Sequence, residues 1–413
     1  MPRIFFLNRY FHPDHSATSQ ILSDLAFHLA ATGRDIHVVT SQQIYDDPAA
    51  RLPSNENVRG VQIHRVATTR FGRSNLIGRG FDYLSFYWSM WRRMVSLAKR
   101  GDIIVAKTDP PLLSALAIFV AKRRSSYLVN WLQDLYPEIA IELGVPFLQG
   151  PLARAIVFLR NRSLRLANAN VVLGTSMAAR VRACGVAEDR IHVIPNWTND
   201  QEIVPIPPAE NPLRREWKLE DKFVVGYSGN LGRAHEFETV LAAAERLRED
   251  LRIVFVLIGG GKQFDELTKR VRARKLEQTF RFFPYQDRAV LKYSLCVPDV
   301  HWISLRPRLE GLIFPSKFYG IAAAGRPMIA ITANGGEIAE LIERHGCGIA
   351  IEPGDADSLS RSLAALSLDP LRCAEMGQRA REMLDAKFSR RQAIERWQSA
   401  LTQIAQSGSI STR

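Results

Sequence analysis

Short apolar runs rich in β-branched and aromatic residues recur along the first half of the chain, and amphipathic stretches separate them. The runs lie at residues 3–8, 36–40, 61–66, 102–106, 127–131, 171–173 and 192–194, and amphipathic stretches lie at 16–31, 112–124 and 150–166. Strand patterns that alternate with helix patterns are typical of βαβ units. The first half therefore predicts a mostly parallel sheet that helices cover on both faces.

The pattern breaks between residues 195 and 212, where prolines cluster and hydrophobic periodicity is weak, as in an interdomain linker. Apolar runs then follow at 222–228, 252–258, 280–283, 300–304, 327–331 and 348–351, with helix patterns between them and at 371–386 and 390–406. We expect an α/β fold with domains at 1–204 and 205–389, and a ligand cleft between them. A C-terminal helix and tail, residues 390–413, complete the chain, and the sequence leaves open whether this helix returns to the first domain.

Composition narrows the class of protein. The chain has 413 residues, of which 46% are hydrophobic and 23% charged, which is typical of folded globular proteins. Its longest uncharged run, Pro110–Ala121, is shorter than the ~18 residues that a membrane-spanning helix needs. The apolar N-terminal run is too short for a secretory signal, so we expect a cytoplasmic protein.

No spacing of cysteine or histidine predicts a metal site. The four cysteines form no C-x-x-C pair, and the Asp355-Ala356-Asp357 triplet is better explained by acidic residues at a helix N-terminus. We therefore expect neither a metal nor a cofactor.

The segment RPRLEGLIFPSKFYG, residues 306–320, is the strongest candidate for chemistry. It follows a predicted buried strand and leads into a helix near Ser316, where backbone N–H groups and Lys317 could bind a phosphate. Glu310 could accept hydrogen bonds from sugar hydroxyls. A surface turn with an ordinary salt bridge is the alternative.

A second candidate is the glycine-containing turn SGNLGRAH, residues 228–235. Its glycines, among them Gly229, would let a phosphate approach backbone N–H groups, with Arg233 and His235 beside it. The spacing is not that of a dinucleotide fingerprint, and the nearby GGGK around Gly260 is not a P-loop. An ordinary strand-to-helix turn remains open.

In the first half, carboxylates follow the predicted strand 127–131. Asp134 could orient an acceptor hydroxyl or act as a base, and Glu138 could join it, although either could serve the following turn instead. After the first strand, His15, Ser16 and Thr18 form a polar entry to the first helix that could meet an acceptor, or could only cap the helix.

These segments resemble glycosyltransferase family 4, whose members are retaining enzymes of the GT-B fold. The family pattern appears in SGNLGRA, EGLIFPSKFYGIAAAGRPMIA and EPGDADSL, and YFHPDHSATSQ, WLQDLYPE, VIPNWTN and FFPYQDR are similar to bacterial exopolysaccharide, colanic-acid and O-antigen glycosyltransferases. The resemblance covers nearly the whole chain. It implies two Rossmann-like domains with parallel sheets that face an interdomain cleft.

The resemblance also implies roles for particular residues. A nucleotide diphosphate sugar would bind the second domain through Gly229, Asn230, Arg233, His235, Gly260, Glu310, Ser316 and Lys317, and an acceptor would bind the first. The family pairs two Glu residues in the second domain, but Phe318 or Gly320 stands where the second Glu would be, depending on how the segment is matched. The ribose contact is therefore not accounted for.

Basic residues concentrate in one part of the chain. The net charge is +13, and residues 51–124 alone carry 14 Lys and Arg against 4 Asp and Glu. Within them, residues 81–100 combine six aromatic residues with four cations, which suits the surface of an anionic membrane. A core helix with a solvated basic outer face is an equal alternative, and no nucleic-acid-binding motif is present.

The predicted function is the transfer of a sugar from a nucleotide diphosphate sugar to a glycan or glycolipid acceptor, at the inner face of the cell membrane. Alternatives are a nucleotide-sugar epimerase of the same fold and a non-catalytic nucleotide-sugar-binding protein.

Overall fold

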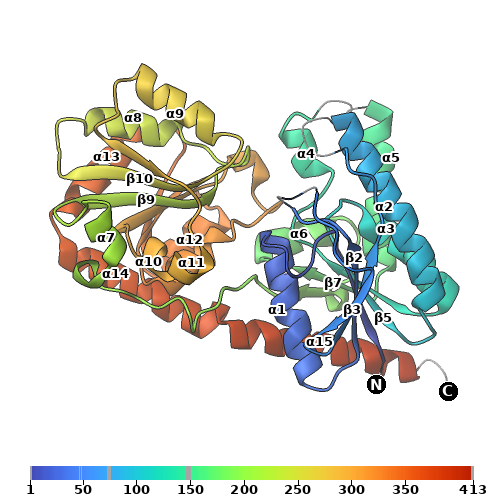
Figure 1. Cartoon of the computed structure of the whole chain (residues 1–413). Helices are drawn as coiled ribbons and strands as arrows, with labels where there is room; N and C mark the ends of the chain where they lie inside the picture. Colours follow the sequence, from blue (N-terminus) through green and yellow to red (C-terminus); the bar gives the residue numbers. More distant parts are fainter. Residues whose placement is uncertain (1, 46, 48, 72–75, 146–149, 411–413) are drawn as a thin grey trace. The chain divides into compact units, whose positions relative to one another are not determined.

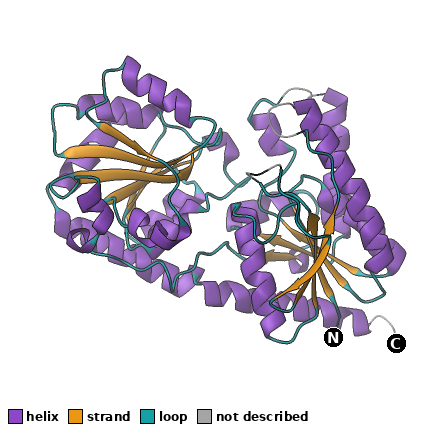
Figure 2. Cartoon of the chain, viewed as in Figure 1, coloured by secondary structure: helices purple, strands orange, loops and turns teal. Residues whose placement is uncertain are grey.

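The computed structural model describes residues 2–45, 47, 49–71, 76–145 and 150–410. The chain divides into two compact units. Unit 1 comprises residues 1–195, 311–313 and 394–413, and unit 2 comprises residues 196–310 and 314–393. Each unit has one sheet with helices on both faces (Figures 1 and 2).

The sheet of unit 1 has eight strands in the order β3-β4-β2-β1-β5-β6-β7-β8. The strands are β1 (Ile4–Leu7), β2 (Ile36–Ser41), β3 (Asn55–Val58), β4 (Val61–Val66), β5 (Ile103–Lys107), β6 (Tyr127–Trp131), β7 (Ala169–Val172) and β8 (Ile191–Val193). The helices are α1 (Ala17–Ala31), α2 (Leu76–Leu97), α3 (Leu113–Arg124), α4 (Glu138–Glu142), α5 (Gly150–Leu166), α6 (Thr175–Ala183) and α15 (Arg390–Ile410).

The two faces of this sheet carry different helices. Phe5 and Leu7 of β1 pack in one apolar cluster with side chains of α2 and α3. Trp131 at the end of β6 contacts Trp397 of α15, with ring centroids 4.6 Å apart. The C-terminal helix α15 therefore belongs to the core of unit 1 from Ile394 onward.

The strand β3 has no counterpart in the sequence-based prediction. Its four residues, NENV, include a single apolar side chain, and it pairs antiparallel with β4 through a turn at Arg59 and Gly60. Both turn residues have positive φ, 51° and 83°, which is typical of a tight hairpin.

The sheet of unit 2 has six parallel strands in the order β11-β10-β9-β12-β13-β14. The strands are β9 (Phe223–Asn230), β10 (Ile253–Gly260), β11 (Phe280–Phe283), β12 (Val300–Ser304), β13 (Met328–Ile331) and β14 (Gly348–Ile351). The helices are α7 (Pro212–Glu216), α8 (Glu238–Arg246), α9 (Phe264–Ala273), α10 (Leu291–Leu295), α11 (Lys317–Ala323), α12 (Glu337–Arg344), α13 (Ala356–Ser367) and α14 (Pro370–Met383). Both sheets confirm the predicted α/β class.

Asp355, the first residue of the D-x-D triplet, is the N-cap of α13. Its side chain accepts a hydrogen bond from the backbone N–H of Ser358 at 2.9 Å. The helix-cap interpretation of this triplet is therefore confirmed.

Candidate active site

Each sheet has one place where the strand order reverses. In unit 1, β1 lies between β2 and β5, and in unit 2, β9 lies between β10 and β12. Loops diverge at such a point beyond the carboxyl ends of the strands, where open α/β sheets bind ligands. The residues singled out from the sequence follow β1 and β6 in unit 1, and in unit 2 they lie at the ends of β9 and β10 or follow β9 and β12.

Lys317, the first residue of α11, extends its side chain to the end of β9. Its Nζ donates hydrogen bonds to the carbonyl of Asn230 at 3.1 Å and to Nε2 of His235 at 3.2 Å, and lies 4.9 Å from the centroid of the Tyr227 ring. Burial lowers the pKa of Lys317 to about 8. The ammonium group is thus charged at neutral pH, partly desolvated and fixed, which suits the binding of a phosphate.

His235 positions Lys317 through a hydrogen bond and is itself neutral. Nδ1 of His235 lies 2.7 Å from the carbonyl oxygen of Ser304, which can only accept, so Nδ1 carries the proton and Nε2 is the acceptor for Lys317. Burial, followed by the charge of Lys317, lowers the pKa of His235 to about 3. A direct contact between His235 and a donor substrate stays a prediction.

Glycines make room for this arrangement. Gly229 has a φ of +115°, and a Cβ there would lie 3.1 Å from Cε of Lys317. Gly259 has a φ of +134°, and a Cβ there would lie only 2.4 Å from the carbonyl oxygen of Gly229. A side chain at either position would be strained. Gly260 pairs with Asn230 in the sheet, and its carbonyl accepts a hydrogen bond from the backbone N–H of Leu231 at 2.7 Å.

Two further predicted donor residues are exposed. Arg233 lies in the loop between β9 and α8, and Ser316 is the N-cap of α11 without a side-chain hydrogen bond to that helix. Arg306, which the sequence analysis did not single out, is also exposed, and its backbone N–H donates to the carbonyl of Ala234 at 3.1 Å. This end of the unit 2 sheet therefore combines Lys317 with two exposed arginines.

The side chain of Glu310, a residue of the loop after β12, reaches the N-terminus of α12. Its Oε1 accepts a hydrogen bond from the backbone N–H of Glu337 at 2.9 Å, and a Cβ on Gly336 would lie 2.9 Å from its Oε2. The absence of a side chain at Gly336 thus lets the carboxylate approach the helix end. Phe318 is fully buried in the core, and a Cβ on Gly320 would touch Leu295, so neither offers a polar group for a ribose.

In unit 1, Asp134 follows β6. Burial raises its pKa to about 6, although a hydrogen bond from the Thr108 side chain lowers it. Its Oδ1 is buried and makes no hydrogen bond to any residue that the structure describes. A buried carboxylate oxygen without a partner is costly, and it is a natural acceptor for the hydroxyl of a substrate.

Lys107, at the end of β5, was missed by the sequence analysis. Its side chain is fully buried, and Nζ donates to the carbonyl of Thr18 at 2.9 Å and lies 4.0 Å from the centroid of the Trp131 ring. Burial lowers its pKa to about 7, whereas the charges of Asp109 and Asp134 raise it. The sequence signal that could have singled out this residue is a lysine at the end of an otherwise apolar strand.

The polar entry to α1 is built around Asp14. The Asp14 carboxylate accepts hydrogen bonds from the backbone N–H of Ser16 at 2.8 Å and from its hydroxyl at 2.5 Å. His15 is exposed, and its carbonyl accepts a hydrogen bond from the Gln20 side chain. The carbonyl of Thr18 accepts the hydrogen bond from Nζ of Lys107. The structure thus brings Thr18 to the end of β5. Acceptor binding by His15, Ser16 and Thr18 stays a prediction.

Glu138, the first residue of α4, forms an ion pair with Arg160 of α5. Arg160 is buried, so this pair has a structural role in holding α4 against α5. Acceptor binding by Glu138 stays a prediction.

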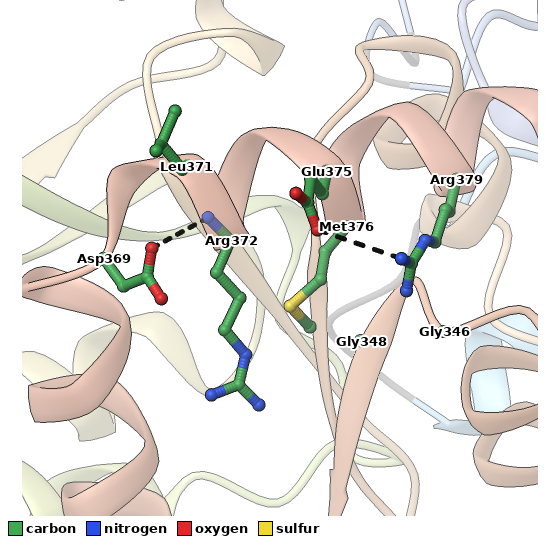
Figure 3. Close-up of a pocket in the computed structure, with 8 residues that line it drawn as sticks. All are labelled: Gly346, Gly348, Asp369, Leu371, Arg372, Glu375, Met376 and Arg379. Carbon is green, nitrogen blue, oxygen red and sulfur yellow. Dashed lines mark hydrogen bonds and ion pairs between the residues drawn. The ribbon is translucent and has the colours of Figure 1, made fainter.

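A separate hollow of about 490 Å³ lies at the other end of the unit 2 sheet (Figure 3). It is lined by Gly346 and Gly348 at the start of β14 and by Asp369, Leu371, Arg372, Glu375, Met376 and Arg379. It opens at the start of a strand, not at the carboxyl end where Lys317 lies, and it contains none of the predicted donor residues.

Two family models match the chain. The model described as glycosyl transferase 4-like domain matches residues 17–197, and the one described as glycosyl transferases group 1 matches residues 210–383. Together they span most of both units.

Two curated proteins are similar over nearly their whole length. The probable glycosyltransferase WbjE of Pseudomonas aeruginosa is 24% identical, and the match covers 99% of this chain and 100% of that protein. The putative colanic acid biosynthesis glycosyl transferase WcaI of Escherichia coli is 23% identical, over 93% of this chain and 97% of that protein.

Solved structures share the fold. The sucrose-phosphate synthase of Thermosynechococcus elongatus has a TM-score of 0.79 at 16% identity, with 98% of this chain and 100% of that chain covered. Anabaena HepE in complex with UDP-glucose has a TM-score of 0.72 at 16% identity, with 97% and 99% covered.

Proposed function

Since this chain belongs to the family 4-like glycosyltransferases of the GT-B fold, we propose that it transfers a sugar from a nucleotide diphosphate sugar to a glycan or polyprenyl-diphosphate-linked acceptor in cell-surface polysaccharide biosynthesis. The observation that carries the proposal is the fixed ammonium group of Lys317 at the carboxyl end of β9. The similar protein WcaI is named for colanic acid biosynthesis, and HepE binds UDP-glucose. HepE supports a nucleotide-sugar donor, and WcaI supports a polysaccharide product.

The chemistry requires stabilisation of a departing diphosphate. The bond between the anomeric carbon and the diphosphate oxygen breaks, and the acceptor hydroxyl oxygen forms a bond to the same carbon from the same face, so the configuration is retained. The hydroxyl proton passes to the departing phosphate oxygen. Lys317 and Arg233 oppose the charge that develops on the diphosphate, and this interaction is stronger in the transition state than in the ground state.

Carboxylates have supporting roles in the proposal. Asp134 accepts a hydrogen bond from the acceptor hydroxyl and orients it, and Glu310 accepts hydrogen bonds from donor sugar hydroxyls. We propose that no metal ion takes part. In support, the described residues contain no group of three or more His, Cys, Asp or Glu that could hold one. Turnover that persists in the presence of EDTA is expected, and its loss would contradict this part.

The location of the enzyme is also a proposal. No helix in the described part of the chain combines the length and the apolar character needed to cross a bilayer. We propose that the enzyme works on the cytoplasmic side of the membrane and meets its acceptor there.

A ligand panel followed by product analysis tests the activity. Nucleoside diphosphates and their sugars are added to the purified chain, and a binding ligand raises the unfolding temperature. Lys317→Met should lose this shift, whereas Lys269→Met, an exposed lysine on α9, should keep it. Turnover that requires an acceptor supports a transferase; isomerised donor without an acceptor would show an epimerase, and binding without turnover a non-catalytic protein.

A further inference from the structure

The outer faces of three neighbouring helices in unit 1 are apolar. Phe81, Leu84 and Trp88 of α2 are 55%, 64% and 60% exposed, Phe119 of α3 is 62% exposed, and Phe158 and Leu159 of α5 are 58% and 45% exposed. The helix α3 packs against both α2 and α5, and the three lie along one flank of the unit (Figure 1). Isolated exposed hydrophobic residues are common, but a group on adjacent helices indicates an interaction surface.

The helix α2 has two distinct sides. Phe86, Met90 and Met94 are fully buried against the sheet, as the core-helix alternative predicts. Phe81, Leu84 and Trp88 lie three and four positions apart, which places them on one stripe facing away from the sheet. The core-helix alternative is thus confirmed on the inner side, whereas the membrane-surface interpretation of the outer side stays a prediction. The helices α3 and α5 extend this outer side beyond residues 81–100.

Cations repeat next to the aromatic residues. Trp88 is followed four positions later by Arg92, Phe119 three positions later by Lys122, and Phe158 four positions later by Arg162, and all three cations are exposed. Residues at these spacings are neighbours on a helix surface. Each of the three helices therefore presents an aromatic ring and a cation side by side.

Acidic charge is absent from this face. The helix α2 carries three Arg, α3 carries one Lys and two Arg, and α5 carries three exposed Arg besides the buried Arg160, whereas the one acidic residue of the three helices is Asp82. Asp82 is buried, and its carboxylate forms an ion pair with Arg9 at 3.7 Å. The partner must therefore be anionic and must also accept apolar side chains.

We infer that the outer face of α2, α3 and α5 docks on the surface of an anionic lipid bilayer. Aromatic and leucine side chains enter the boundary between headgroups and acyl chains, and the neighbouring arginines and lysines contact lipid phosphates. A second copy of the chain is disfavoured because a symmetric dimer would place this cationic surface against itself. The inference does not depend on the proposed transferase activity.

Flotation of the full chain with lipid vesicles tests the inference. We expect binding to phosphatidylcholine vesicles that contain phosphatidylglycerol, weaker binding at high salt and little binding to phosphatidylcholine alone. The triple variant Arg92→Glu, Lys122→Glu, Arg162→Glu should lower the partition coefficient at least ~100-fold, since each cation near the surface contributes about a factor of five. Trp88→Ser with Phe119→Ser and Phe158→Ser should lower it about tenfold or more.

A matched control separates this surface from net charge. Arg248→Glu, Lys269→Glu and Arg272→Glu change the same number of exposed cations on unit 2 and should leave binding unchanged. Circular dichroism checks the fold of each variant. If a triple variant fails to fold, the single variants Trp88→Ser and Arg92→Glu are tested in its place.

Four outcomes would each overturn the inference. They are an absence of flotation, equal losses of binding in the control, a dimer that forms through this face, and binding to RNA in place of vesicles. Vesicle binding needs no sugar donor, so its failure and a failure of turnover are distinguishable.

Discussion

The ammonium nitrogen of Lys317 lies 3.2 Å from Nε2 of His235, although the two residues are 82 positions apart in the chain. The carbonyl of Ser304 fixes the proton on the other ring nitrogen, so the histidine can only accept from the lysine. The ammonium group of Lys317, at the start of α11, is thus held in one orientation by the loop between β9 and α8.

Removal of this cation should abolish most of the turnover. We expect Lys317→Met to lower kcat by about 10²–10³-fold, because a fixed cation that meets developing charge is lost. Release of nucleoside diphosphate measures the rate. His235→Gln, whose side chain can still accept from Lys317, should retain more activity than His235→Leu. Full turnover by Lys317→Met would contradict the proposed role.

The rate should have a bell-shaped dependence on pH. Asp134, with a pKa raised to about 6, becomes a carboxylate as the pH rises through 6, and Lys317, with a pKa lowered to about 8, loses its charge above 8. We therefore expect kcat/KM to rise to a maximum near pH 7 and then fall. Asp134→Asn should remove the acid limb and keep the alkaline limb. An unchanged acid limb in that variant would exclude Asp134 as its source.

The contact of Glu310 with α12 and its proposed contact with the donor sugar can be separated by substitution. Glu310→Gln keeps an oxygen that can accept from the backbone N–H of Glu337 but loses the charge, whereas Glu310→Ala loses both. We expect the Gln variant to keep its unfolding temperature and to raise the KM for the donor about tenfold, since hydrogen bonds to a charged group are stronger. The Ala variant should also lose about 1 kcal/mol of stability. An unchanged KM in both variants would show that Glu310 contacts α12 and does not contact the donor.

Lys107 should lower the stability of unit 1 at neutral and acidic pH. Its pKa is lowered to about 7 in the folded chain, so between about pH 7 and the ordinary lysine value the unfolded chain binds more protons. Stability of the wild type should therefore rise with pH across that range. Lys107→Met should raise the free energy of unfolding by about 1–4 kcal/mol at pH 6, and the gain should shrink at higher pH.

Urea unfolding at a series of pH values measures this effect. The charge of Lys107 also lowers the pKa of Asp134, so the acid limb of the rate profile should move to higher pH in Lys107→Met. A variant that is less stable than the wild type at pH 6 would show that the contacts of Nζ with Thr18 and Trp131 outweigh the cost of burying the charge.

The sequence by itself determined most of the elements and the class of fold. Strands such as Val61–Val66, Tyr127–Trp131 and Val300–Ser304 begin and end where the apolar runs predict, because hydrophobic periodicity is a local property. The sequence also predicts a ligand site at Lys317 and at residues 230–235, since loops after buried strands carry ligand sites in this class. The structure brings these residues together, and donor binding by them stays a prediction.

Only the tertiary structure decided which distant groups meet. The strand β3 lacks an apolar run and forms because β4 offers it a partner. Lys107 is buried on the carbonyl of Thr18, 89 positions away, and the start of α12 receives Glu310 from 27 positions upstream. Burial, pKa and hydrogen-bond partner all depend on the neighbours that packing supplies, and a one-dimensional pattern of residue types carries no information on those neighbours.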